Sequence, residues 1–355
     1  MLLVGILLSM IVGSQSVVLT AEASPTAGLI SAGAATNPTT SPDEGNFSIA
    51  WITDTQYLSA DHPTYFTSLC QWIVNHQKMY NIKMVIHTGD LVDSESDLTQ
   101  WTNANASMSV LLNAGVPYCW NAGNHDYNST FWVGNQFAAF NPAVMAEKPY
   151  WVDDMFDGQS TAVHFSVRDQ DFLVVNVANQ ANDTVLSWAN SVLDSYLESH
   201  AIVATHFYVN RTGGYEEWAS NFRRSVLATH SSVFLTLSAH VYPLANSGLR
   251  TQVGGRHELV FNRQEKDSKM GAASLRILTF DLTQGVVDVR TFYIYANTFL
   301  TDADNQFTLD TAFRNDSAAT ESAEIPELSV TAVLALLVVL LVAVCILRVR
   351  ARFSC

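Results

Sequence analysis

The sequence has 355 residues, of which 48% are hydrophobic and 14% are charged. This apolar content is enough to bury a sizeable core, which excludes a chain that is disordered throughout. There are 33 acidic and 18 basic residues, and the formal net charge is −15. Nucleic-acid binding draws on clustered Lys and Arg side chains, so we expect no nucleic-acid partner.

The N-terminal part is predicted to be a targeting segment followed by a linker. Residues 1–23 combine an apolar stretch with Ala21-Glu22-Ala23, which would serve as a small-residue cleavage site. Because no Lys or Arg precedes the apolar stretch, the segment is either a cleaved signal peptide or an uncleaved N-terminal anchor. Residues 24–45 are rich in Ala, Thr, Ser and Pro and have no apolar period, which predicts a flexible linker.

Residues 46–300 form one continuous domain pattern of strands and helices. In chain order the pattern predicts strand 47–53, helix 65–80, strand 83–87, helix 101–113, strand 116–121, hairpin 162–177, helix 185–197, strand 201–204, helix 216–229 and strand 233–237. Strands that alternate with helices favour a parallel sheet. Residues 250–295 are typical of antiparallel strands, and we expect them to close a second sheet against the first.

The C-terminal part is predicted to be a stalk, a membrane helix and a short tail. Residues 301–327 are acidic and favour a stalk. Residues 328–347 are 20 residues without a charge, long enough to cross a membrane as a helix. The tail, 348–355, contains Arg348, Arg350 and Arg352, which the positive-inside rule places in the cytoplasm. We therefore expect a single-pass protein of the cell membrane, with residues 46–300 outside the cell.

Short polar stretches follow the predicted strands or close the domain: Asp54-Thr55-Gln56, Gly89-Asp90-x-x-Asp93, Gly123-Asn124-His125-Asp126, Thr205-His206, Ala239-His240 and Asn262-Arg263-Gln264. The carboxyl ends of parallel strands meet at one edge of a sheet, so these side chains are expected to gather there. A hydrolytic two-metal site needs a carboxylate that bridges two cations, together with further oxygen and imidazole ligands. The stretches supply these groups and predict such a site.

In their order and spacing the stretches resemble the calcineurin-like metallophosphoesterase superfamily, and specifically its Asp-Thr-Gln branch, over about residues 47–295. The resemblance implies an α/β fold, a four-layer β-sandwich flanked by helices, around two divalent or mixed-valence metal ions (Mn, Fe or Zn). It implies hydrolysis of a small phosphorylated substrate by a hydroxide that the two ions activate. With the C-terminal helix in the membrane, this reaction would take place on its outer face.

The resemblance also assigns roles to individual residues. The implied metal ligands are Asp54 and Gln56 at the first ion, Asn124, His206 and His240 at the second, and Asp90 as the bridge between them. His125 would protonate the leaving oxygen or stabilise the transition state, and Asp126 would orient His125. Asp93 would hold its loop in place.

Two positions depart from the family pattern. Gln56 stands where most members have His, and its amide oxygen can still coordinate a hard cation. Tyr242 stands where the final motif has its last His, and a phenol is a poor ligand for Zn or Mn at neutral pH. The alternative function is therefore a metal-binding surface protein whose catalysis is weakened by Tyr242. A third possibility is an enzyme that uses only the second metal site.

Several residues outside the motifs have competing interpretations. Cys70 and Cys119 could form a disulfide, but two small core residues are the favoured interpretation. His87 lies in a predicted buried strand and is expected to be a core histidine. His257 could approach the site as a substitute ligand, although chance placement is favoured. Either a substrate wall or core packing would explain three aromatic residues of the segment after Asp126: Trp132, Trp151 and Phe156.

Overall fold

The computed structural model describes residues 46–128, 132–243, 248–311 and 313. The predicted targeting segment, linker, membrane helix and tail lie outside these residues. Within the described part of the chain, no helix is both long enough and apolar enough to cross a membrane.

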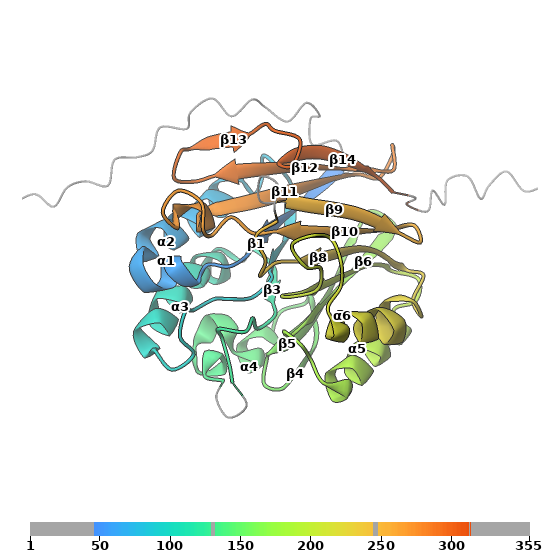
Figure 1. Cartoon of the computed structure of the whole chain (residues 1–355), viewed down its shortest axis with the longest axis horizontal. Helices are drawn as coiled ribbons and strands as arrows, with labels where there is room; N and C mark the ends of the chain where they lie inside the picture. Colours follow the sequence, from blue (N-terminus) through green and yellow to red (C-terminus); the bar gives the residue numbers. More distant parts are fainter. Residues whose placement is uncertain (1–45, 129–131, 244–247, 312, 314–355) are drawn as a thin grey trace, which may run out of the picture.

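Two seven-stranded sheets form the centre of the molecule (Figure 1). The first has the order β13-β12-β11-β1-β2-β3, with β14 paired to β12. Its strands are β1 (Asn46–Ile52), β2 (Ile82–His87), β3 (Tyr118–Trp120), β11 (Ser274–Asp281), β12 (Val286–Tyr293), β13 (Thr298–Leu300) and β14 (Gln306–Asp310). The second has the order β4-β5-β6-β7-β8-β10-β9. Its strands are β4 (Trp151–Met155), β5 (Ser160–Val167), β6 (Gln170–Val177), β7 (His200–Thr205), β8 (Val233–Ser238), β9 (Gly248–Val253) and β10 (Arg256–Phe261).

Helices lie on the outer side of each sheet (Figure 1). The first sheet carries α1 (Gln56–Asp61), α2 (Pro63–His76) and α3 (Leu98–Ala114), and the second carries α5 (Asp183–Ser195) and α6 (Glu217–Phe222). The shorter elements are α4 (Pro142–Met145), the 3-10 turns η1 (Gly134–Gln136), η2 (Ala138–Phe140) and η4 (Met270–Ala272), and the π-helical turn η3 (Arg223–Leu227). The Asp97 carboxylate caps α3 by accepting from two backbone N–H groups, which satisfies donors that the helix leaves unpaired.

Three separate hydrophobic cores divide the molecule into four layers. In β1, Phe47 and Ile49 belong to the core between the two sheets, whereas Ala50 and Ile52 belong to the core under α2 and α3. This alternation follows from the two-residue period of a strand. The third core lies between the second sheet and α5 and α6. The predicted arrangement of helices, sheet, sheet and helices is therefore confirmed.

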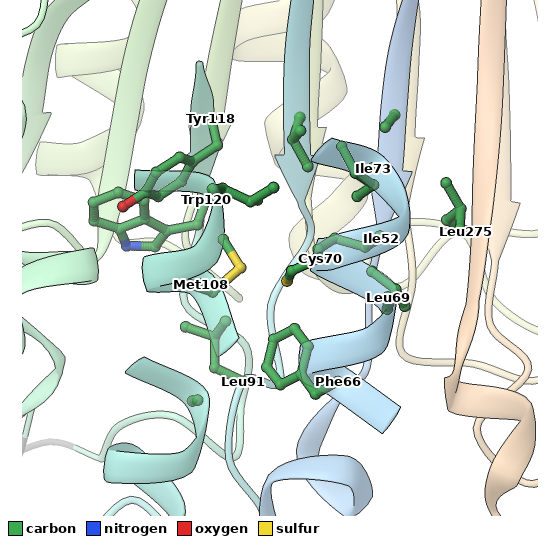
Figure 2. Packing of buried hydrophobic residues seen from close by; sticks show 14 of the residues in the cluster. Ile52, Phe66, Leu69, Cys70, Ile73, Leu91, Met108, Tyr118, Trp120 and Leu275 are labelled. Carbon is green, nitrogen blue, oxygen red and sulfur yellow. The ribbon is translucent and has the colours of Figure 1, made fainter. Parts of the chain in front are cut away.

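Cys70 and Cys119 are free thiols in different cores. Cys70 lies on α2 with Phe66, Leu69 and Ile73, facing strand residues such as Ile52 (Figure 2). Cys119 lies in β3 and faces the core between the sheets. Burial raises the pKa of both thiols. Their interpretation as small core residues is confirmed, and the disulfide alternative is wrong.

The structure corrects three predicted elements. The strands expected between residues 250 and 295 do not form one sheet, because β9 and β10 extend the second sheet beside β8 while β11 and β12 extend the first beside β1. The predicted helix 216–229 is shorter and ends in the η3 turn. Residues 306–310, predicted to belong to the acidic stalk, form β14, because the alternate residues Phe307 and Leu309 pack onto the core between the sheets.

Parallel pairing determines where the polar stretches lie. β1, β2 and β3 are mutually parallel in the first sheet, and β6, β7 and β8 are parallel in the second. The loops after β1, β2, β3, β7 and β8 carry the predicted site residues. The chain crosses from β10 in the second sheet to β11 in the first through residues 262–273, which begin with Asn262-Arg263-Gln264.

Candidate metal centre

Three predicted ligands have a left-handed backbone conformation that non-glycine residues rarely adopt. The φ angles are 49° at Asp54, 56° at Asp90 and 65° at His240. Each of these residues lies one or a few positions past the end of its strand. Such conformations cost on the order of 1 kcal/mol each and concentrate at functional sites, where the surrounding structure holds them. Here they turn the three side chains back over the strand ends.

Four predicted ligands converge on one point. The Nε2 atom of His206 lies 3.2 Å from Asp90 Oδ2, 3.1 Å from Asn124 Oδ1 and 3.1 Å from His240 Nδ1. Asp90, His206 and His240 form a group whose ligand atoms all lie within 4.8 Å of one another. His206 Nδ1 donates to the carbonyl oxygen of Thr88 at 2.8 Å. This fixes the proton on Nδ1 and turns the Nε2 lone pair toward the cluster.

The remaining predicted ligands, Gln56 and Asp54, adjoin this group. The Gln56 amide nitrogen donates to Asp90 Oδ2 at 3.1 Å, and the Gln56 Oε1 atom is buried with no hydrogen-bond partner among the described residues. Buried amide oxygens are normally satisfied, so an unpaired oxygen beside a buried carboxylate suits a cation. Asp54 is fully buried here as well, and accepts from the Thr53 hydroxyl at 2.8 Å. With Asp90, these residues would offer oxygen ligands to a second cation.

The electrostatics of the buried side chains suit positive charge. Burial raises the pKa of the Asp54 carboxyl to about 7, and the neighbouring Asp90 charge adds to the effect. Burial opposes the charged form of His206, but the Asp90 carboxylate outweighs it and raises the His206 pKa to about 9. Burial, with the neighbouring His206, lowers the pKa of His240 to about 4. Two carboxylates this close disfavour joint ionisation unless cations lie between them.

The structure exchanges the expected roles of Asp126 and Asp93. Asp126 was expected to orient His125, but its carboxylate accepts instead from the backbone N–H groups of Leu91 at 2.7 Å, Val92 at 3.1 Å and Gly123 at 2.7 Å. It therefore ties the loops after β2 and β3 together. The half-buried His125 is held by Asp93, because its Nδ1 donates to the Asp93 carbonyl oxygen at 2.9 Å. The Asp93 carboxylate lies 3.7 Å from the same atom.

The loops after β2 and β3 approach each other too closely for a side chain at Gly123. A Cβ atom at Gly123 would lie 2.2 Å from Asp90 Oδ1 and 2.3 Å from Asp90 N. The N–H of His125 donates to the same Oδ1 at 3.0 Å. Gly123 thus permits the backbone after β3 to approach the Asp90 carboxylate closely.

Asn262 is a site residue to which the sequence assigned no role. It is fully buried, and its amide nitrogen donates to Asp54 Oδ1 at 2.9 Å and to the His240 carbonyl oxygen at 3.0 Å. Its own oxygen accepts from Gln264 N at 2.9 Å. Asn262 therefore joins the loop after β1 to the loop after β8. The polar Asn262-Arg263-Gln264 stretch after a buried strand was the available signal, but only the tertiary structure shows what it contacts.

The Tyr242 hydroxyl is hydrogen-bonded to polar neighbours. It accepts from Gln264 Nε2 at 2.8 Å and donates to Glu265 Oε1 at 3.1 Å. Tyr57 also donates to Glu265 Oε1, at 3.1 Å. Burial raises the pKa of Tyr242, so the phenol stays protonated at neutral pH. A protonated phenol engaged in this way is not a metal ligand.

Two histidines and two aromatic residues outside the motifs are structural, whereas Phe156 is 44% exposed. His87 is fully buried, its Nε2 lies 2.9 Å from Thr55 Oγ1, and burial lowers its pKa to about 3, which confirms a core histidine. His257 donates from Nε2 to the Asp310 carbonyl oxygen at 2.7 Å, at the opposite end of β10 from Asn262. Trp132 and Trp151 pack against the core under α2 and α3.

Comparison with known proteins assigns the family. A family model described as calcineurin-like phosphoesterase matches residues 47–243, more than half of the chain. The chain belongs to the calcineurin-like phosphoesterase family. Its predicted membership is confirmed at this level.

Individual relatives of this phosphoesterase chain are distant. It is 29% identical over 271 residues to the uncharacterized protein YvnB of Bacillus subtilis (strain 168), a match that covers 72% of this chain and 20% of that relative. The chain thus spans about one fifth of the length of YvnB. A dimetal phosphatase from Danio rerio superposes with a TM-score of 0.51 at 12% identity, over 75% of this chain and 99% of that one. This second likeness concerns the fold.

Replacing Gly123 by Ala should displace the Asp90 loop and strongly reduce metal content, because the new Cβ would overlap Asp90. Metal per chain, measured by mass spectrometry after gel filtration, tests this. The control is Gly115→Ala at the end of α3, where φ is 69° and nothing lies within 4 Å. It should cost on the order of 1 kcal/mol of stability and keep the metal. Equal metal content in both variants would contradict the close approach.

Replacing Asn262 by Ala should remove the hydrogen bond to Asp54 and lower the metal content per chain. The loss of stability should be no larger than in a control variant. The matched control is Asn305→Ala, which alters another fully buried Asn in the loop between β13 and β14. Both variants remove buried hydrogen bonds and should lose roughly 1–3 kcal/mol on chemical denaturation. Only Asn262→Ala should lose metal. Loss of metal from both would mean that general destabilisation is responsible.

Proposed function

We propose that the chain hydrolyses phosphate esters, using two metal ions held between the loops of the two sheets. The main supporting observation is that Asp90, Asn124 and His240 converge on His206 Nε2, while Gln56 and Asp54 lie beside them. Oxygen and imidazole donors around a central carboxylate match the requirements of Mn, Fe or Zn. Divalent ions bound there would supply Lewis-acid polarisation of the phosphate and lower the pKa of a water molecule.

The chain's own groups then bind and orient the substrate. Asn124 is exposed, while its Oδ1 lies beside His206, so its amide N–H groups can reach a phosphate oxygen. His125 is fixed through Nδ1 by Asp93, which leaves Nε2 to hold a proton toward the leaving oxygen. A positioned imidazole of this kind contributes through general acid catalysis. Asp126 acts indirectly, because it fixes the loops that carry Asp90 and His125.

The substrate is proposed to be a small phosphorylated molecule met outside the cell. Support for this location comes from the sequence: the uncharged residues 328–347 and the Arg residues after them favour a single membrane span with residues 46–300 on the outer face. Tyr57 and Tyr242 lie beside the metal centre and would help to determine the substrate class and the choice between a monoester and a diester.

The second candidate function is a metal-binding surface protein with weakened catalysis. Tyr242 favours it, because the hydroxyl is engaged with Gln264 and Glu265 and leaves the first cation with fewer protein ligands. Under this function the second position would still bind a cation through Asp90, His206 and His240. An enzyme that uses only this position is the intermediate case.

The purified protein should contain about two metal ions per chain and hydrolyse an aryl phosphate in a chelator-sensitive way. Metal content is measured together with turnover of an aryl monoester and an aryl diester, with Mn added and with chelator. His206→Ala should lose both metal and turnover. The control His164→Ala, at a half-buried histidine of β5 outside the site, should keep both. Absence of turnover with every added cation would favour the binding protein.

Tyr242→His should change turnover by less than about tenfold, because the proposed enzyme already works without a ligand at this position. Tyr242→Phe removes the hydroxyl, keeps the ring, and serves as the matched control. The rates of the three proteins are compared at saturating metal. A sharp rise in Tyr242→His alone would mean that the first metal position is damaged in the natural sequence.

A further inference from the structure

A cavity of about 780 Å³ lies at the end of the second sheet opposite the metal centre. Its wall includes the start of β8, the η3 turn and the Gly254-Gly255 turn between β9 and β10. His240 follows the other end of β8, and Asn262 follows the other end of β10. A six-residue strand spans about 20 Å. The cavity is therefore separate from the metal centre.

The charge of this cavity is opposite to that of the whole chain. Its lining includes Arg223, Arg224 and Arg256 together with His230 and His257, and no Asp or Glu. The chain as a whole has 33 acidic and 18 basic residues. Three guanidinium groups around one hollow in such a protein form a local positive field.

A buried carboxylate holds one of the three arginines in place. Arg256 donates to Glu258 Oε1 at 3.1 Å and to the Leu227 carbonyl oxygen at 3.1 Å. Glu258 is also bound by the hydroxyls of Tyr208 and Tyr215 and is nearly fully buried. Its charge therefore offsets Arg256 from behind the cavity wall. Arg223 and Arg224 also line the cavity, and no ion pair with an acidic residue is found for either of them among the described residues.

The guanidinium groups retain donors that the described residues do not use. The Nε atoms of Arg223 and Arg256 are buried and have no hydrogen-bond partner within the described part of the chain. Arg223 is positioned by stacking, with its Cζ 3.9 Å from the centre of the Tyr215 ring. Arg224 is exposed at the mouth. Buried N–H donors are normally paired, and the guanidinium fork matches the oxygens of a phosphate group.

We propose that this cavity, which we call the arginine cavity, binds the phosphate group of a small molecule, or inorganic phosphate itself. Arg223 and Arg224 provide the charge, and Arg256 fixes the wall. The volume leaves room for an organic part beside the phosphate group. The inference does not depend on the proposed hydrolysis, because no residue of the metal centre takes part.

The test is calorimetric titration of the purified protein with inorganic phosphate in the presence of chelator, at constant ionic strength. Chelator removes the cations through which phosphate would bind at the metal centre. Arg224→Ala should weaken binding by about tenfold, Arg224→Lys by less because the charge remains, and Arg223→Gln with Arg224→Gln should abolish it. Lys78→Ala removes an exposed charge at the end of α2 and should change nothing. His206→Ala should also bind phosphate normally.

Three outcomes would overturn the proposal. The first is no phosphate binding by the unaltered protein at millimolar phosphate. The second is binding that survives both arginine substitutions or is lost in His206→Ala, which would place the phosphate elsewhere. The third is an equal response to chloride, which would show only general screening. Should the double variant fail to fold, the exposed single substitutions at Arg224 still decide the question.

Discussion

The Asp90 carboxylate is the group on which the site depends. Asp90 is buried in the loop after β2 of the first sheet, yet its carboxylate also contacts His206 after β7 of the second sheet. Oδ1 accepts from the His125 N–H, and Oδ2 contacts both Gln56 and His206. An isolated buried carboxylate costs several kcal/mol in lost hydration. Burial opposes the charged form of Asp90, but the neighbouring His206 and the hydrogen bonds outweigh it and lower the Asp90 pKa. Cations bound beside Asp90 would stabilise its charge further.

The rigidity of this arrangement comes from the backbone as much as from the ligands. Asp126 fixes three N–H groups of two loops with a single carboxylate, and Asn262 joins two more loops across the sheets. Both residues are fully buried, so removing either would leave unsatisfied polar groups in a region of low dielectric. The left-handed conformations at Asp54, Asp90 and His240 are stable because these cross-links hold the loops from both sides.

Much of the fold could be predicted because local patterns and layer packing agree. The short β-rich run of β1 predicted a buried strand, and the residues after each parallel strand predicted where the polar side chains would gather. The division of residues 250–295 between two sheets could not be predicted, since antiparallel strands have the same pattern whichever sheet they join. β14 was missed because its acidic neighbours obscured the short Phe307, Leu309 alternation.

Within the site, the motifs predicted which polar side chains gather at the strand ends, but not how the residues around them are hydrogen-bonded. Asp126, the neighbour of His125 in the sequence, was expected to orient it, and Asp93 was expected only to hold its own loop. The difference arises from backbone direction, which aims the Asp93 carbonyl at the imidazole and the Asp126 carboxylate at three N–H groups. Tyr242 illustrates the same limit, because its partners Gln264 and Glu265 are brought to it only by the crossing between the sheets.

The distribution of charge explains why the net charge of −15 says little about ligands. The carboxylates of the metal centre and the arginines of the arginine cavity lie at opposite ends of β8 and β10, about 20 Å apart by strand length. Screening in physiological salt acts over about 8 Å, so through solvent the two regions scarcely influence each other. Each end of the second sheet therefore presents its own field. An acidic chain can then hold cations between its loops at one end and present guanidinium groups to an anion at the other.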